Sequence, residues 1–183
     1  MATGNHTLHQ DEVVYAESLN VGGTAITATA AEINAAADSS GRVITTTATA
    51  LSLTVTEHGN RIVLVDTNST VANTLTLPVA TGSGAKFTII NNIAQTQGSI
   101  VIAANGTTDT LKGVAVVSNT STTVNVQSFL SSATSDKVTW NRTTTGGAGP
   151  GDYFEAWDGA ENVWTVQVRA GSVGAAATPF SAT

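Results

Sequence analysis

From Gly41 onward, the chain consists of short runs in which apolar and polar residues alternate, separated by turn residues. Side chains of a strand point alternately to its two faces, so this period of two predicts strands with one buried face. Runs that recur every ~8–14 residues are typical of an all-β domain. The runs are LSLTV (51–55), RIVLVD (61–66), TLTLP (74–78), KFTII (86–90), SIVIAA (99–104), TVNVQSFL (123–130), DKVTWNR (136–142) and WTVQV (164–168).

About ten strands are too many for one flat sheet, so we expect a sandwich or a jelly-roll-like barrel over residues 41–183. The run at 61–66 is almost continuously apolar, which predicts a strand buried on both faces. Asn105-Gly106 predicts a tight turn, and Asp158-Gly159 predicts the turn of a hairpin over 152–168. The Gly-rich segment 143–151 is long enough to cross from one sheet to the other.

Residues 1–40 lack this strand periodicity and predict an extended N-terminal arm with one short helix at about 29–37. Thr29 followed by Glu32 is the spacing of a capping box, in which each residue binds the other's backbone amide. Ile33 is the helix's single large apolar residue, and so short a helix is marginal alone in water. The segment EVVYAESLNV (12–21) could add a strand to another sheet, with Val13, Tyr15 and Leu19 as anchors.

The composition excludes several classes of function. Charged residues make up only 11% of the chain and the net charge is −6. Residues 1–41 hold five acids and no base (net −5), and the remainder holds eight acids and seven scattered bases (net −1). Nucleic-acid binding needs a basic patch, so we expect none. The chain has no cysteine, and no apolar run approaches the ~18 residues of a membrane span. Without a signal-peptide pattern, we expect synthesis and assembly in a cytoplasm.

Histidines supply two candidate sites for chemistry. His6, His9 and Asp11 have a spacing that could hold a metal ion, but they lie near a terminus with no second shell of polar partners. His58 precedes Gly59 and is interpreted as a surface turn residue rather than a base. We therefore expect no metal, no cofactor and no histidine catalyst.

Carboxylates and tryptophans supply two more candidates. Asp152, Glu155 and Asp158 could form a catalytic pair, but strand alternation places Asp152 and Glu155 on opposite faces, and we interpret the group as a solvated turn. Trp140, Trp157 and Trp164 could form a sugar-binding platform, although with few aromatics in the chain we interpret them as core residues. The sequence predicts no enzyme.

Two stretches resemble virion proteins of tailed bacteriophages. LNVGGTAITATAAEINAAAD (19–38) resembles a segment of phage tail-fibre and head-decoration proteins. SGRVITTTATALSLTVTEHGNRIVLVD (40–66), LTLPVATGSGAKFTIINN (75–92) and GSIVIAANGTTDTLKG (98–113) are similar to the β-domain of capsid decoration (cement) proteins and of some fibre modules. Together they cover about half of the chain.

This resemblance implies a non-enzymatic capsid decoration protein, a homotrimer that binds the outer head surface and stabilises the shell. Its partners would be the major capsid protein and itself, and its location the capsid surface of the virion, after synthesis in the bacterial host. Ile33, packed around a three-fold axis or against the shell, would then gain the burial that its helix lacks, and Ile26 is a further candidate contact. A short tail-fibre or fibre-attachment protein is the alternative, followed by a carbohydrate-binding module that uses the tryptophans.

Overall fold

The computed structural model describes residues 19–21, 23–27, 29, 32–33, 40–120 and 125–182. By its internal contacts the chain divides into two units, Met1–Ser39 and Ser40–Thr183. Val13 and Tyr15 of the expected arm lie outside the described residues.

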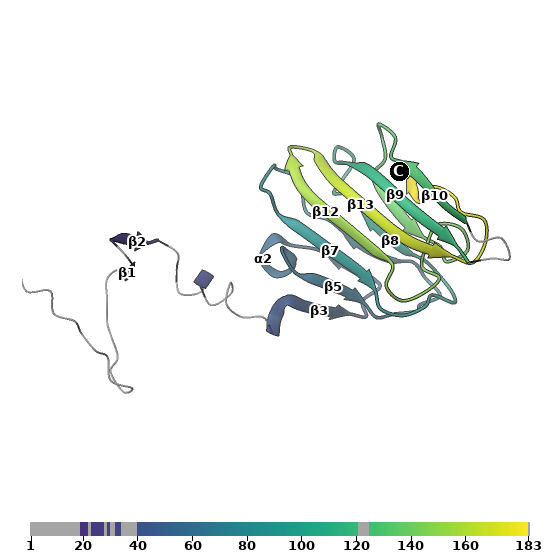
Figure 1. The fold of residues 1–183 in the computed structure, drawn as a ribbon, viewed down its shortest axis with the longest axis horizontal. Helices are drawn as coiled ribbons and strands as arrows, with labels where there is room; N and C mark the ends of the chain where they lie inside the picture. The colour runs from purple at the N-terminus through teal and green to yellow at the C-terminus, as the bar shows by residue number, and fades with distance from the viewer. Residues whose placement is uncertain are drawn as a thin grey trace, which may run out of the picture. The chain divides into compact units, whose positions relative to one another are not determined.

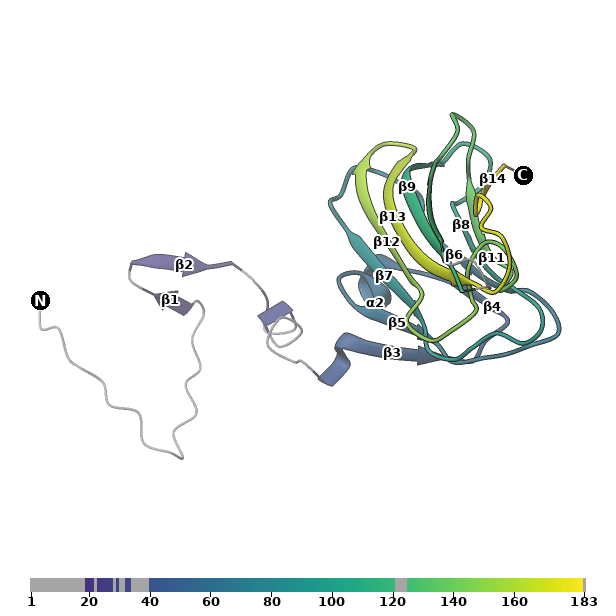
Figure 2. The ribbon, with the colours of Figure 1, turned by 45° about the vertical axis from the view of Figure 1, so that its right-hand side comes forward.

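The second unit is a sandwich of two β-sheets, which confirms the all-β fold class (Figures 1 and 2). The larger sheet has seven strands, in the spatial order β10 (Asn125–Leu130), β9 (Thr110–Asn119), β13 (Val163–Ser172), β12 (Tyr153–Ala160), β7 (Lys86–Asn91), β5 (Ile62–Val65) and β3 (Val43–Thr46). The smaller has five, in the order β14 (Phe180–Ser181), β11 (Lys137–Trp140), β8 (Ile100–Ala103), β6 (Asn73–Thr76) and β4 (Ala50–Ser52). A 3-10 turn (Ser40–Arg42) precedes β3.

From β3 to β9, successive strands alternate between the two sheets, so neighbours within a sheet are not neighbours in sequence. As a result β3, β5 and β7 pair in parallel, and so do β4, β6 and β8. The hairpins are β9–β10 and β12–β13, and β13 also pairs in parallel with β9 over ten residues. The loop 143–151 carries the chain from β11 in one sheet to β12 in the other, as expected.

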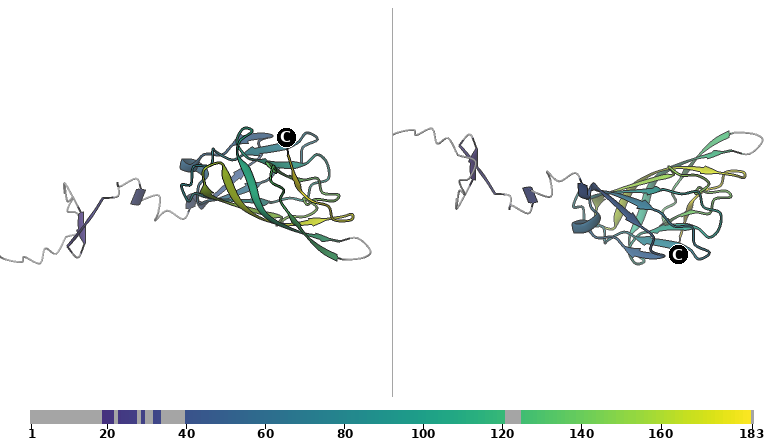
Figure 3. Two further views of the ribbon diagram at one scale, coloured as in Figure 1. Left: turned by 90° about the horizontal axis from the view of Figure 1, so that it is seen from above. Right: turned by 90° about the horizontal axis from the view of Figure 1, so that it is seen from below.

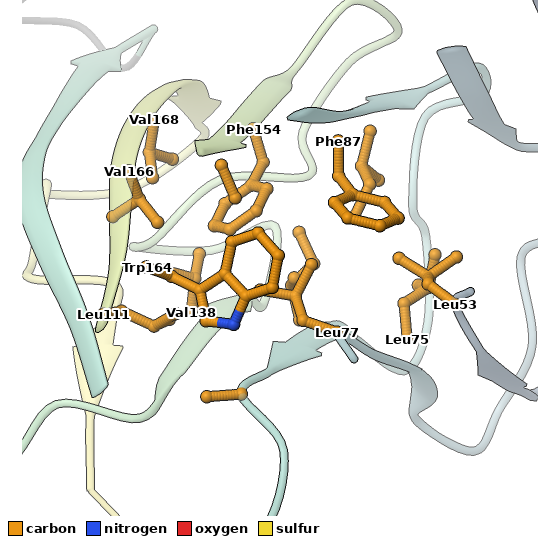
Figure 4. Packing of buried hydrophobic residues seen from close by; sticks show 14 of the residues in the cluster. Leu53, Leu75, Leu77, Phe87, Leu111, Val138, Phe154, Trp164, Val166 and Val168 are labelled. Carbon is orange, nitrogen blue, oxygen red and sulfur yellow. The ribbon is translucent and has the colours of Figure 1, made fainter. Parts of the chain in front are cut away.

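Figure 3 shows the two sheets from above and below. The hydrophobic core fills the space between them (Figure 4). Trp164 and Phe87 lie edge to face, with ring centroids 5.5 Å apart and an interplanar angle of 78°. Trp140 comes from the five-stranded sheet and is also fully buried. The alternation of buried and half-buried residues along β5, β7 and β11 shows that each strand gives one face to this core.

The prediction that the run 61–66 is buried on both faces is wrong. Val63 and Val65 are fully buried, whereas Ile62 and Leu64 are only half-buried. The strand is apolar on both faces, but only one of them has the second sheet against it.

The prediction of a turn at Asp158-Gly159 is also wrong. Strand β12 continues to Ala160, which pairs with Val163, so the turn is Glu161-Asn162, with Asn162 at a φ of 61°. The strand is irregular between Asp158 and Ala160. Asp158 pairs with Trp164 inside the hairpin, and its carboxylate binds the loop 81–83 instead of the turn.

A short helix, α2 (Val55–His58), replaces the end of the strand expected at 51–55. Thr54 caps it by accepting a hydrogen bond from the Glu57 amide at 3.2 Å. His58 is 6% exposed, and its Nδ1 accepts the Thr54 amide at 3.1 Å, so its interpretation as a surface residue was wrong. The hydrogen bond from the Thr54 amide, the N-cap of α2, holds the His58 ring inside the fold.

Candidate functional site

The N-terminal unit presents a capped turn. The Thr29 amide donates to Glu32 Oε2 at 2.7 Å, and the Glu32 amide donates to Thr29 Oγ1 at 3.2 Å, which confirms the predicted capping box. These bonds from the Thr29 amide and hydroxyl lower the pKa of Glu32. Ile33 follows, with its amide bound to the Thr29 carbonyl at 3.0 Å and its side chain 40% exposed. A local hydrogen-bonded frame thus displays one apolar side chain.

The same unit contains a small hairpin of β1 (Leu19–Val21) and β2 (Thr24–Ile26). Leu19 and Ile26, both expected to bind a partner, are register partners in it. Gly23 has a φ of 84°, which suits glycine in a tight turn. The part of the expected strand that is described therefore pairs within its own unit.

Asp158, at one end of β12, organises the loop 81–84. Its carboxylate accepts the amides of Thr81, Gly82 and Ser83 at 2.7–3.1 Å and the Ser83 hydroxyl at 2.7 Å. Burial alone would raise the pKa of Asp158, but the hydrogen bonds from Ser83, Gly82 and Thr81 lower it to about 2. This carboxylate stays ionised and holds the loop to the strand.

Asp152, just before β12, has the opposite electrostatics. Burial raises its pKa to about 6, although the amides of Gly147 and Gly171 bind the carboxylate, the latter at 2.8 Å. It ties the loop 143–151 to β13.

Glu155 lies on the other face of β12, as alternation predicts. It forms an ion pair with Lys86 and accepts a hydrogen bond from Thr88 at 3.3 Å. Burial alone would raise the pKa of Glu155. The bonds with Lys86, Tyr153 and Thr88 outweigh burial, so the pKa is lowered. Burial, together with Glu155, raises the pKa of Tyr153 to about 12.

The interpretation of these three carboxylates as a solvated turn was wrong, because each is at most 7% exposed. They do not converge on a common point: Asp152 and Asp158 lie at opposite ends of one strand, and Glu155 on its other face. Each is bound by its own loop or by Lys86.

The tryptophans do not form a joint platform. Trp140 and Trp164 are fully buried, whereas Trp157 is half-buried on the outer side of β12 with Lys86 Nζ 5.6 Å from its ring centroid. The core interpretation is confirmed for the first two and wrong for Trp157, because its place in the strand turns it away from the second sheet.

The outer face of the seven-stranded sheet is the most distinctive surface of the sandwich. In Figure 1 the viewer looks onto this face, and no other described strand or helix of the sandwich lies over it. It nevertheless carries several large apolar side chains, among them Val114, Val126 and Leu130, which are 39%, 63% and 78% exposed. Such an apolar surface marks an interaction site more often than chance.

Three adjoining depressions run along this face over β9 and β13. The largest is an open groove of about 560 Å³ between β9, β13 and the loop 148–151. Arg169 of β13 lines all three depressions and is exposed. A polar strip with one guanidinium therefore crosses an otherwise apolar face.

Sequence reasoning missed this face. The signal was present in the run RIVLVD, which is apolar at both parities, and in TVNVQSFL, where Val126 and Leu130 share one parity. The first run was expected to be buried on both faces and the second to be an alternating strand, because a sequence does not distinguish a buried apolar face from an exposed one.

In the described part of the chain, no cluster of three or more histidines and acids is placed to hold a metal ion, and no helix is long and apolar enough to cross a bilayer. His6, His9 and Asp11 lie outside that part. No protein-family model matches the chain, and neither a curated protein nor a solved structure matches it.

Proposed function

We propose that this protein is a non-enzymatic decoration (cement) protein of a tailed-phage capsid, a homotrimer that binds the major capsid protein on the outer head surface. The observation that carries the proposal is the uncovered apolar face of the seven-stranded sheet, because a domain built to act alone would place polar residues there. Residues 19–38 and three stretches between residues 40 and 113 resemble phage virion proteins, and this resemblance supports a phage particle as the assembly that the protein joins.

The N-terminal unit supports a second, separate contact. The capping box around Thr29 and Glu32 fixes a turn whose apolar residue, Ile33, remains 40% exposed. A turn of this length gains little stability by itself, so its order is best explained by burial of Ile33 against a partner. Five acids and no base in residues 1–41 would steer this unit toward a basic surface.

The carboxylates support a structural rather than a catalytic role. Asp152 and Asp158 bind backbone amides that position loops, and Glu155 is neutralised by Lys86. A general acid or base needs a free position beside a substrate. Each of the three groups instead has hydrogen bonds or an ion pair within the fold, and the three do not converge on one point.

Binding to heads tests the proposal directly. Heads and tails of the phage that encodes the chain, prepared without this protein, are incubated with it and separated by sedimentation. We expect saturable binding to heads, and weaker binding by the variant Ile33→Asp than by the matched exposed-valine variant Val71→Asp. Binding to tails alone would replace the proposal by the tail-fibre alternative, and binding to neither would refute both.

A further inference from the structure

Two apolar patches lie at opposite ends of the outer face of the seven-stranded sheet. The β10–β9 patch consists of Val114, Val116, Val126 and Leu130, which alternation and pairing place on one side of the sheet. The β5–β7 patch consists of Val43, Ile62, Leu64 and Ile90, joined by the register of β3, β5 and β7.

A polar strip on β12 and β13 separates the two patches. It carries the Lys86–Glu155 ion pair and Arg169. Because Lys86 and Glu155 already neutralise each other within one chain, covering them would not leave an unpaired charge.

The size of the face fits an interface between copies of the chain. Seven strands spaced ~4.8 Å apart and on average about seven residues long project roughly 780 Å². Side-chain relief makes the accessible area larger, and standard protein interfaces bury ~800 Å² per partner. The area of the outer face of one copy is thus large enough for a stable interface if most of the face is covered.

We infer that three copies turn this face toward a common three-fold axis, so that the β10–β9 patch of each copy packs on the β5–β7 patch of the next. This inference rests on the proposed homotrimer and names its surface. A three-fold ring requires two different patches per copy that complement each other, whereas a two-fold dimer uses one patch twice. The sheet offers two patches, one at each end.

The charges on the face are complementary in this arrangement. Arg169 pairs with Tyr153, Tyr153 with Ile90 and Ile90 with Leu64, so Arg169 and Leu64 occupy one row across the strands. Asp66 follows Leu64 by two residues, just beyond the end of β5, and its carboxylate accepts a hydrogen bond from the Asn92 side chain at 3.0 Å. Continued alternation places it on the side of Leu64, one row further along.

Rotation about an axis parallel to the strands keeps each row at its height. Arg169 of one copy then lies about one row, ~7 Å, from the height of Asp66 in the next copy, which is within the reach of an arginine side chain. Within one copy Arg169 on β13 and Asp66 at the end of β5 are separated by β12 and β7, so in this arrangement they pair between copies.

The two edge strands of the seven-stranded sheet, β10 and β3, are consistent with contacts to neighbouring copies. Edge strands of soluble proteins are commonly blunted by lysine, proline or bulges. The edge strand β10 has the sequence NVQSFL and pairs regularly with β9 along its whole length, and the opposite edge strand β3 is VITT. Neither strand contains a charge or a proline.

A charge exchange in the full-length protein tests the inference. Native mass spectrometry at micromolar concentration measures the trimer for wild type, Arg169→Asp, Asp66→Arg and the double variant, with circular dichroism to verify folding. We expect each single variant to weaken the trimer at least tenfold and the double variant to restore it. Lys137→Asp, on the outer side of the five-stranded sheet, is the matched control and should remain trimeric.

The apolar patches are tested by a matched pair of valines. Val126→Asp should abolish the trimer, whereas Val71→Asp, at a valine that is 57% exposed in a loop, should not. A trimer that survives Arg169→Asp, Asp66→Arg and Val126→Asp, or a wild-type chain that is monomeric, would overturn the inference.

Head binding distinguishes this result from the proposed function. If the protein binds heads and its trimer is unaffected by these substitutions, the proposed interface is refuted and the proposed function is not. If the substitutions disrupt the trimer but the wild-type protein binds no heads, the proposed function is refuted and the proposed interface is not.

Discussion

The two faces of the seven-stranded sheet have similar chemistry but different surroundings. The inner face buries Trp164, Phe87 and Phe154 against the five-stranded sheet. The outer face carries valine, leucine and isoleucine at nearly the same density, yet Val126 and Leu130 are more than half exposed. For these aliphatic residues, what separates the core from the exposed surface is the cover supplied by the five-stranded sheet.

This difference explains why alternation alone is an incomplete guide. A strand such as β5 is apolar on both faces, and its sequence predicts two buried faces. The domain supplies one of them, so the second is available for another chain. Four predictions sharpen or break this contrast between the faces.

The largest expected effect is the loss of Trp164 from the inner face. Trp164→Ala should destabilise the sandwich by about 3–5 kcal/mol, because it leaves a cavity beside Phe87. Trp157→Ala, on the outer face, should cost only about 1 kcal/mol, mainly its contact with Lys86. Urea unfolding of dilute protein measures both, and equal losses would mean that the two faces are equally packed.

The next effect concerns Asp158, which closes one end of the inner face. Asp158→Ala should cost about 1–3 kcal/mol, because the amides of the loop 81–83 lose a charged acceptor. Its pKa is lowered from 3.8 to about 2, so its contribution is present above pH ~4 and is lost as the pH falls toward 2. A variant as stable as wild type at pH 7 would contradict this role.

Asp152, at the other end of β12, should show the opposite pH dependence. Its pKa is raised from 3.8 to about 6, so the folded state binds more protons than the unfolded state between these values. The free energy of unfolding should therefore fall as the pH rises from about 4 to 6, by at most ~3 kcal/mol from this group. The difference between wild type and Asp152→Ala across this range isolates the effect, and a difference that grows with pH would reverse the assignment.

The smallest expected effect lies in the N-terminal unit. Thr29→Ala removes the cap of the turn, which costs about 1 kcal/mol of local order. Because the bonds described for Thr29 and Glu32 link residues 29–33 only, the unfolding transition of the sandwich should stay unchanged. A clear shift of the main calorimetric transition would show that this turn is part of the same cooperative unit.

The sequence allowed much of the fold to be predicted, because periodicity is a local signal. Strands such as 86–90 and 99–104 lie close to their expected positions, and the capping box of Thr29 and Glu32 is confirmed. Thr54 and Glu57 have the same spacing and begin α2, but the alternation before them favoured a strand.

The candidate surface could not be predicted in the same way, because it depends on which strands become neighbours. Val114 and Leu130 meet through hairpin pairing, but Leu64 and Ile90 meet only because β5 and β7 pair in parallel across a crossover to the other sheet. Likewise, Asp158 contacts Thr81 from far along the chain. Contacts between distant segments leave no periodic trace.

The alternation of successive strands between the sheets also has a consequence for the time course of folding. Strand β13 joins β9 across roughly 50 residues of intervening chain, and β12 joins β7 across a longer interval, so the central pairings close large loops. Such a topology favours folding in milliseconds to seconds rather than microseconds. The seven-stranded sheet is incomplete until β13 has left the ribosome, so the nascent chain exposes its apolar strands until that strand is synthesised.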